Sequence, residues 1–345
     1  MELTTVWFIL IAVLWIGYFV LEGFDFGVGI LLPFLARNDT ERRVMINTIG
    51  PVWDGNEVWV LVAGGATFAA FPEWYATLFS GFYLPLLLIL LALIVRGVAF
   101  EYRHKHDRAS WRGRWDKAIF WGSLLPAVLW GVAFANIVRG VPIDENKEYV
   151  GGFFDLLGPY ALLGGLTTLG LFLTHGAVFV ALKTDGDIRH RARDLGLVLG
   201  LATAALAVVF LVWTQAITGS LWSSALFVGA ALALLGGLFA TWKVREGWAF
   251  VGTFAAIGLA VAGLFVALFP DVMPSSLDPA WSLTTTNAAA TDYTLTIMTW
   301  VAVIFTPLVL MYQGWTYWVF RKRISVHHIP AEAAATPPTA GQPTR

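Results

Sequence analysis

The most regular feature of the chain is a series of long apolar stretches separated by short polar segments. Nine of them approach the twenty or so apolar residues that a helix needs to cross the hydrocarbon layer of a membrane. They are residues 7–35, 51–70, 77–100, 117–138, 160–182, 196–218, 222–242, 248–269 and 293–320. Strands of a membrane barrel would be about ten residues long and would alternate in character. The pattern therefore predicts an all-α integral membrane protein with nine transmembrane helices.

The second stretch is the weakest of the nine, because it is short and opens on the polar sequence Trp53-Asp54-Gly55-Asn56-Glu57. A re-entrant or tilted segment is the alternative there. The basic residues favour a full crossing: with nine spans and the N-terminus outside, every Lys and Arg faces the cytoplasm except Arg96, Arg139 and Lys147. That asymmetry is the positive-inside rule. We expect a membrane domain over residues 1–329, with the N-terminus outside, and a disordered cytoplasmic tail over residues 330–345, which are rich in Ala, Thr and Pro.

Composition narrows the functional classes. Apolar residues make up 58% of the 345 residues, charged residues make up 13%, and the mean hydropathy is +0.70. Soluble domains have about 45–50% apolar and about 25% charged residues, so an ordinary soluble enzyme and a disordered protein are excluded. The net charge of −1 offers no field that would attract nucleic acid. The sequence contains no cysteine, which excludes disulfides, thiolate metal sites and iron–sulfur clusters.

Ionisable side chains inside the predicted helices are the candidate chemistry. Those lying well away from helix ends are Glu22, Asp25, Asp54, Glu57, Arg96 and His175. Each costs about 2.5–3.5 kcal/mol at mid-helix, so they must face protein or water, or be neutral. Glu22 and Asp25 are three residues apart and share a helix face, and Asp54 and Glu57 repeat that spacing on the next helix.

Two interpretations of this acidic group remain open. Two carboxyl pairs and one Arg cannot balance each other, so at least one carboxyl keeps a proton or contacts water, which suits a proton entry path from the cytoplasm. The structural alternative is that Arg96 neutralises one or two acids while Asn56 and backbone groups satisfy the others. For His175, hydrogen bonding between helices is the expectation, with haem ligation as the alternative. No metal-ligand spacing occurs within a span.

Several unusual motifs resemble subunit II of the cytochrome bd quinol oxidase family. They are EGFDFGVG at residues 22–29, RNDTERR at 37–43, WDGNEVW at 53–59, RGVAFEYR at 96–103 and FPDVMPSS at 269–276. Together with shorter matches they extend from residue 22 to residue 320 and fit the nine-span layout of that family.

The resemblance implies a function that the residues alone do not give. The family's complex works in aerobic respiration in the bacterial cell membrane, where it oxidises quinol and reduces oxygen to water. Two haems b and one haem d belong to the partner, subunit I, which forms a pseudo-symmetric heterodimer with subunit II. The resemblance therefore implies no haem ligated by this chain and no nucleic acid partner. It leaves open a bound quinone in this chain and small accessory subunits.

The resemblance also carries roles over to individual residues. Glu22, Asp25 and Asp54 match acidic positions of a cytoplasmic proton channel; some relatives have Asp at the first position, and Glu22 keeps the acid on a longer arm. Arg96 and Asp116 match positions that matter for activity or assembly. Trp53 matches a position associated with quinone contact or subunit integrity. Glu57 joins the proton path on the spacing argument alone.

Two other classes of function compete with this one. A proton-coupled secondary transporter also needs acids within the membrane, but it usually shows interrupted helices in both halves of the chain. Here the acids are confined to the N-terminal third, and the sixth to ninth spans have no charged residue away from their ends. A membrane scaffold without chemistry is the third option, and the variant Asp54→Asn distinguishes the three.

Overall fold

In the computed structural model, which describes residues 2–329, nearly the whole chain is α-helical. The α-helices of this part are α1 (Leu3–Leu35), α2 (Asp39–Ile49), α3 (Trp53–Ala70), α4 (Pro72–Gly81), α5 (Tyr83–Tyr102), α6 (Ala109–Arg139), α7 (Pro159–Lys183), α8 (Asp187–Thr218), α9 (Leu221–Trp242), α10 (Glu246–Leu268) and α11 (Asp292–Val319). Short 3₁₀ turns are η1 (Arg103–Lys105), η2 (Phe153–Leu157), η3 (Pro279–Trp281) and η4 (Val326–His328). The tail expected over residues 330–345 lies outside the described residues.

Eight helices in residues 2–329 are long and apolar enough to cross a membrane: α1, α5, α6, α7, α8, α9, α10 and α11. An all-α integral membrane fold is thereby confirmed. The expected second span is a helix as well, α3, but it is only 18 residues long, carries Asp54 in its first turn and is not one of the eight.

The expected third span, residues 77–100, is wrong as a single helix. The chain interrupts the helix at Phe82, between α4 and α5. Pro85 accounts for the interruption, because it has no N–H to donate to the carbonyl of Gly81 four residues earlier, yet it is tolerated in the first turn of a new helix. A further helix, α2, lies within the segment treated as a polar connection. Asn38 caps it by accepting a hydrogen bond from the Glu41 backbone N–H at 2.9 Å.

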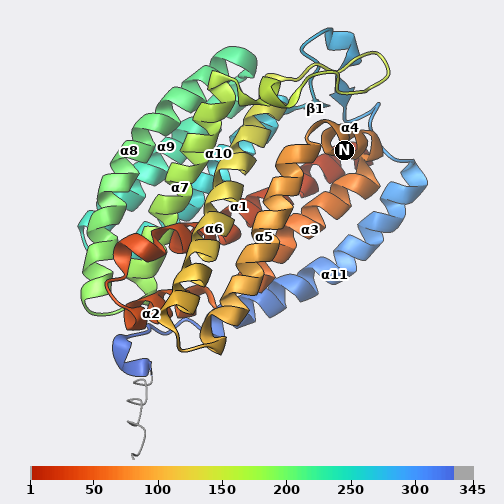
Figure 1. Ribbon diagram of the computed structural model, residues 1–345. Helices are drawn as coiled ribbons and strands as arrows, with labels where there is room; N and C mark the ends of the chain where they lie inside the picture. Colours follow the sequence, from red (N-terminus) through yellow and green to blue (C-terminus); the bar gives the residue numbers. More distant parts are fainter. Residues whose placement is uncertain (1, 330–345) are drawn as a thin grey trace, which may run out of the picture.

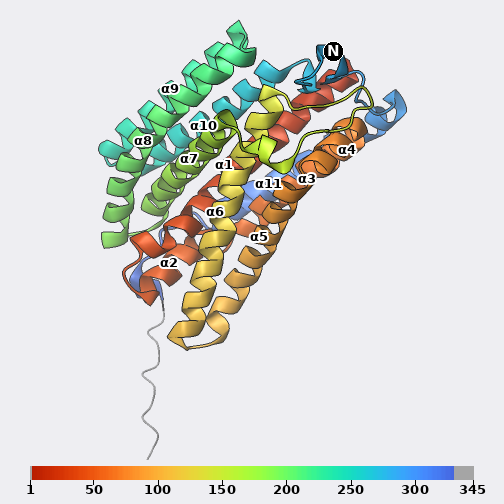
Figure 2. The same ribbon diagram turned by 45° about the horizontal axis from the view of Figure 1, so that its top comes forward.

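Helix α1 lies at the centre of the bundle and packs against α3, α6, α7 and α10. Figure 1 and Figure 2 show α8 and α9 on one side of α1, with α3, α5 and α11 on the other. Glycines permit the closest approach: a Cβ built on Gly27 of α1 would lie 2.0 Å from the backbone oxygen of Phe172 on α7.

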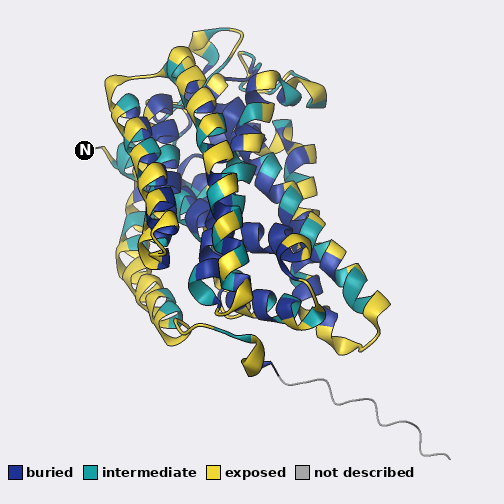
Figure 3. Ribbon diagram, turned by 90° about the vertical axis from the view of Figure 1, so that its left-hand side faces the viewer, coloured by how far each residue is buried: buried dark blue, intermediate teal, exposed yellow. Residues whose placement is uncertain are grey.

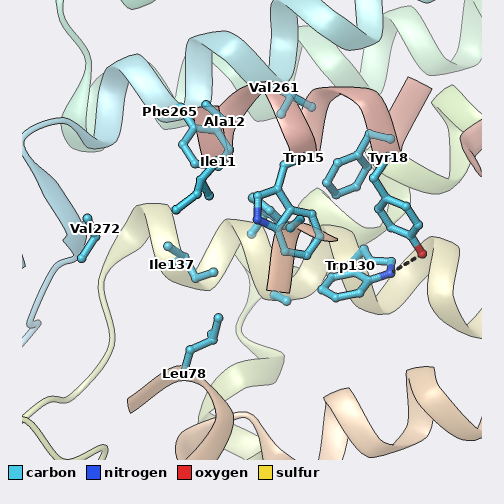
Figure 4. Close-up of a cluster of buried hydrophobic side chains, with 14 of the residues drawn as sticks. Ile11, Ala12, Trp15, Tyr18, Leu78, Trp130, Ile137, Val261, Phe265 and Val272 are labelled. Atoms are coloured by element: carbon cyan, nitrogen blue, oxygen red, sulfur yellow. Dashed lines mark hydrogen bonds between the residues drawn. The ribbon is translucent and has the colours of Figure 1, made fainter. Parts of the chain in front are cut away.

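The half of the core nearer the start of α1 is aromatic. Trp15 and Tyr18 of α1 meet Trp130 of α6, and the Trp130 indole N–H donates to the Tyr18 hydroxyl at 3.1 Å (Figure 4). Around this contact the core residues are buried, whereas the outward turns of the peripheral helices are exposed (Figure 3). Exposed apolar turns of this kind are expected of helices that face lipid or a partner.

The two ends of the bundle differ in structure. At the end that carries the start of α1, the connections include a two-stranded antiparallel sheet, β1 (Asp271–Met273) with β2 (Leu283–Thr284). At the other end lie α2 and η1, together with the segment after α11, where the Ile324 N–H donates to the Lys183 carbonyl at 2.8 Å. The start of α1 and the end of α11 are therefore at opposite ends (Figure 1).

Candidate proton site

Arg96 on α5 is the centre of the candidate site. Its side chain is fully buried, and its Nη1 donates to Glu22 Oε1 on α1 and lies 3.5 Å from Glu57 Oε2 on α3. The guanidinium also lies over the rings of Phe26 and Phe100, at 4.8 and 5.3 Å from their centroids. Three helices and two aromatic faces therefore fix this cation in place.

A glycine on the neighbouring helix makes room for Arg96. A Cβ built on Gly122 of α6 would lie 2.7 Å from the Arg96 Cβ and 2.8 Å from the Ala92 carbonyl oxygen. Helices α5 and α6 can therefore pack backbone to backbone at the level of the guanidinium.

Asp25 does not pair with Arg96. Its Oδ2 accepts a hydrogen bond from Asn56 Nδ2 at 2.7 Å, no donor among the described residues reaches its Oδ1, and its carboxyl lies within hydrogen-bonding reach of the Glu22 carboxyl. Asn56 Oδ1 in turn accepts from the Tyr317 hydroxyl at 2.7 Å and from Gln313 Nε2 at 3.3 Å, both on α11. Finally, Gln313 Oε1 accepts from the indole N–H of Trp59 at 2.9 Å.

Gln313 and Tyr317 were not among the residues expected at the site. They are uncharged, so a search for ionisable groups passes over them. The sequence did contain a signal for them: Gln313 and Tyr317 are polar residues four apart within the last apolar stretch, so their side chains lie on one helix face. Their partner Asn56 was expected to satisfy an acid, and it contacts Asp25.

Asp54 and Trp53 lie at the edge of this group. Asp54 is exposed in the first turn of α3, and none of the ion pairs described for residues 2–329 includes it. Trp53 is half-buried, and its ring centroid lies 5.1 Å from that of Phe100, which places it beside the residues that enclose Arg96. Of the four acids expected on the proton path, the structure brings Glu22 and Glu57 onto one cation and leaves Asp54 outside.

The charges in the buried group do not balance. Glu22, Asp25 and Glu57 supply three carboxyls against the single guanidinium of Arg96. Buried atoms without a hydrogen-bond partner remain on both sides of the group: the oxygens Glu22 Oε2, Asp25 Oδ1 and Glu57 Oε2, and the Arg96 donors Nε and Nη2. Buried polar atoms are nearly always hydrogen-bonded, to protein or to ordered water. Such a group is suited to hold an exchangeable proton, because neutralising one carboxyl relieves the excess negative charge.

Exposure of the acids is graded from the surface inward. Asp54 is exposed, the side chain of Glu57 is 22% exposed, and Glu22 and Asp25 are fully buried. Glu57 is thus the partly exposed acid among the three that gather around Arg96 and Asn56.

Asp116 belongs to a separate ionic cluster at the α2 end of the bundle. Its Oδ1 accepts from Arg103 Nε at 2.6 Å, and its Oδ2 accepts from Arg42 Nη1 at 3.2 Å. Arg103 and Arg112 also bind Asp39, at 2.6 and 2.8 Å. Partial burial disfavours the ionised form of Asp39, but the hydrogen bonds and positive charges of the two arginines outweigh it and lower its pKa. The cluster joins α2, η1 and α6.

His175 on α7 makes hydrogen bonds between helices, as expected. Its Nδ1 lies 2.7 Å from Thr253 Oγ1 on α10, its Nε2 lies 3.2 Å from the Val20 carbonyl oxygen on α1, and its ring stacks on Phe250. Both ring nitrogens are engaged, so this histidine does not fit the role of an axial haem ligand. Residues 2–329 also contain no group of three or more His, Cys, Asp or Glu that could hold a metal ion.

Comparisons with known proteins agree with one another. The family model described as cytochrome bd terminal oxidase subunit II matches residues 3–320. Cytochrome bd ubiquinol oxidase subunit 2 of Bacillus subtilis (strain 168) is 45% identical over 330 residues, covering 94% of this chain and 97% of the relative. Cytochrome bd-I ubiquinol oxidase subunit 2 of Escherichia coli (strain K12) is 39% identical over 363 aligned positions, covering 94% and 96%.

A solved structure shares the fold. A chain in the structure of bd oxidase from Geobacillus thermodenitrificans superposes with a TM-score of 0.77, covering 93% of this chain and 100% of that chain. The two sequences are 17% identical, so this likeness supports the arrangement of helices alone.

Proposed function

Because the chain belongs to the cytochrome bd terminal oxidase subunit II family, we propose that its buried acids carry protons from the cytoplasm toward oxygen chemistry in a partner subunit. The chain is subunit II of a bd-type quinol oxidase, a multi-pass protein of the bacterial cell membrane. It contributes to a complex that oxidises quinol with oxygen as acceptor. This family assignment replaces the proton-coupled secondary transporter considered from the sequence.

The complex contains haem and a partner, subunit I. We propose that subunit I ligates all three haems, two of type b and one of type d. His175, whose two ring nitrogens already have partners, is consistent with that division. Small accessory subunits stay a prediction.

The observation that carries the proton proposal is the excess of buried carboxyls over buried cations around Arg96. A proton taken up by exposed Asp54 has Glu57 one helical turn away. Glu57 shares the cation Arg96 with Glu22, and Asp25 is one turn from Glu22 on the same face, toward the α2 end of α1. In this proposal the acids act together between the exposed start of α3 and the buried group around Arg96.

The structural interpretation accounts for only part of these contacts. Arg96 pairs with Glu22 and Glu57, and Asn56 pairs with Asp25, as a purely structural role requires. This interpretation does not account for the buried oxygens of Glu22 and Asp25 that lack a hydrogen-bond partner. Asp54 has a structural reason of its own, because an acid in the first turn of a helix is stabilised by the helix dipole. Proton transfer gives the unpartnered oxygens a role.

The variant Asp54→Asn in the complete complex tests the proposal. We expect the complex to assemble with an unchanged haem absorption spectrum and to consume oxygen more slowly, because the outermost proton acceptor is lost. The matched control is Asp278→Asn in the loop after β1, which removes an acid far from the site. Loss of the assembled complex in Asp54→Asn alone would point to a structural role, and normal turnover would remove Asp54 from the path.

We further propose nine spans, with α3 as the second, the N-terminus outside and the C-terminus in the cytoplasm. The opposite placement of the start of α1 and the end of α11 supports an odd number of crossings (Figure 1). The end that carries α2 and η1 is also the end rich in Lys and Arg. A reporter fused after residue 329 that proved active only outside the cell would contradict this orientation.

The face formed by α11 with α3 and α5 is where we place subunit I. Only 6% of the apolar window of α11 is buried, and exposed apolar residues run along it, among them Trp300, Phe305 and Leu308. Apolar surface of this extent marks a contact with lipid or with another protein. Subunit I is the occupant we propose because Asp25 and its partners lie directly behind α11.

A quinone bound by this chain would fit the groove between α3 and α5. The groove has a volume of about 430 Å³ and is lined by Phe79, Tyr83 and Trp130. A Cβ built on Gly64 or Gly65 of α3 meets nothing within 4 Å, so these glycines leave the groove open. We expect Gly64→Leu to lower the quinone recovered by solvent extraction of the purified complex, whereas equal recovery would argue against this place.

A further inference from the structure

The hydrogen bonds between α3, α11 and α1 have a single possible direction. An indole nitrogen can only donate, so the Gln313 atom that faces Trp59 must be the amide oxygen. The opposite Gln313 atom is then the NH₂ group, and it faces Asn56. The Asn56 atom that receives it must therefore be the carbonyl oxygen.

The orientation of Asn56 determines which oxygen of Asp25 can be protonated. With its carbonyl turned to Gln313 and Tyr317, Asn56 presents its NH₂ group to Asp25 Oδ2 and, at 3.4 Å, to the Leu21 carbonyl oxygen. A carbonyl only accepts, so the Leu21 contact requires the same orientation. Asp25 Oδ2 is consequently held as an acceptor, and a proton on Asp25 must sit on Oδ1, the oxygen that no donor reaches.

We propose that Trp59, Gln313 and Asn56 form a hydrogen-bond chain of fixed direction that positions Asp25 for proton transfer, holding Oδ2 as acceptor and reserving Oδ1 for the proton. The inference rests on the proposed proton function of Asp25 and adds three positioning residues to it. Two of them, Gln313 and Trp59, touch no acid in the structure, so their effect is exerted through Asn56.

Packing holds the first member of this chain in place. A Cβ built on Gly17 of α1 would lie 2.1 Å from the Trp59 ring, so the absence of a side chain at Gly17 provides the space for the indole. The Tyr317 hydroxyl gives Asn56 Oδ1 a second donor at 2.7 Å. Asn56 itself is fully buried, which leaves its amide no water-facing alternative.

The charged and titratable groups that face Asp25 come from four helices. They are Glu22 on α1, Glu57 on α3, Arg96 on α5 and Tyr317 on α11. A donated N–H stabilises the ionised form of a carboxyl more than its protonated form. When the donor is lost, Asp25 retains its proton to higher pH while these other groups stay in place.

The test compares Gln313→Leu and Trp59→Phe in the complete complex, with Trp222→Phe on the exposed face of α9 as control. Gln313→Leu removes the NH₂ group that fixes Asn56 without adding a charge, and Trp59→Phe removes the donor that fixes Gln313. We expect the alkaline side of the pH profile of oxygen consumption to move upward by roughly half to one pH unit in both, the size of one hydrogen bond. The haem spectrum and the control profile should not change.

Infrared difference spectroscopy provides a readout that a merely structural role would not move. A C=O group that accepts a hydrogen bond vibrates at lower frequency than a free one, so the band of protonated Asp25 should shift to higher wavenumber in both variants. The band is identified by its loss in Asp25→Asn.

The outcomes separate the two proposals. An unchanged pH profile and an unchanged band in both variants, with slow turnover in Asp25→Asn, would overturn the positioning chain alone. Normal turnover in Asp25→Asn would overturn the proton function on which the chain rests.

Discussion

Removing the cation from the buried group is the sharpest perturbation of the site. In Arg96→Gln, Glu22 loses the cation that donates to it and Glu57 loses its ion pair. Exposed ion pairs contribute about 0–1 kcal/mol, but Arg96 and Glu22 are both fully buried. Stranding one member of a buried pair costs about 3–5 kcal/mol. The two ring contacts of the guanidinium add to that loss.

The assay is the half-life of the purified complex at elevated temperature, followed by its haem absorption. We expect Arg96→Gln to shorten this half-life at least roughly tenfold, and more at alkaline pH, where a stranded carboxyl is less readily neutralised by a proton. A second substitution, Glu22→Gln, removes the stranded charge and should recover much of the loss, since a neutral pair leaves no buried ion. Additive losses in the double variant would refute the reasoning, as would an unchanged half-life in Arg96→Gln.

Three further predictions concern other parts of the molecule. Gly27→Leu places a side chain against the Phe172 carbonyl oxygen, which meets a built Cβ at that position. We therefore expect α1 and α7 to separate and the yield of assembled complex to fall severely. The control Gly113→Leu, with nothing within 4 Å of its Cβ, should leave the yield unchanged. Asp39 has a lowered pKa, so its ionised carboxylate stabilises the fold fully above the unfolded pKa of about 4, and this stabilisation is lost as the pH falls through the folded pKa. Asp39→Asn should therefore be less stable than the wild type at neutral pH and lose less further stability on acidification. An identical loss of stability on acidification in the two proteins would contradict this. His175→Ala removes two hydrogen bonds between helices, so the complex should lose roughly 1–3 kcal/mol of stability and keep its full haem content; a missing haem band in a folded complex would contradict the structural role.

The sequence predicted what depends on periodicity and on the cost of charge in a membrane. Seven of the expected spans are confirmed as long apolar helices, and α5 covers most of the expected third span. The cost of buried charge predicted that Arg96 would neutralise one or two of the acids, and it contacts Glu22 and Glu57. The interruption at Phe82 was missed because apolar character continues through it, and only Pro85 indicates a new helix start.

Other features depend on contacts that no local pattern specifies. Whether Asp25 faces Arg96 or Asn56 is decided by the rotation of α1 against α3, which the packing of the whole bundle sets. Gln313 lies more than 250 residues from its partners Asn56 and Trp59 in the sequence, so its role follows from the position of α11. Asp54 has the same spacing to Glu57 as Asp25 has to Glu22, yet it remains exposed.

Time-resolved proton uptake tests the central claim most directly. The reduced complex, oriented in vesicles with its α2 end facing a pH-sensitive dye, is mixed with oxygen, and the wild type is compared with Asp25→Asn and the loop control Asp278→Asn. The account predicts that uptake slows in Asp25→Asn alone, with the haem spectrum intact. Uptake in Asp25→Asn at the wild-type rate would show that protons reach the oxygen chemistry without this carboxyl, and would contradict the account.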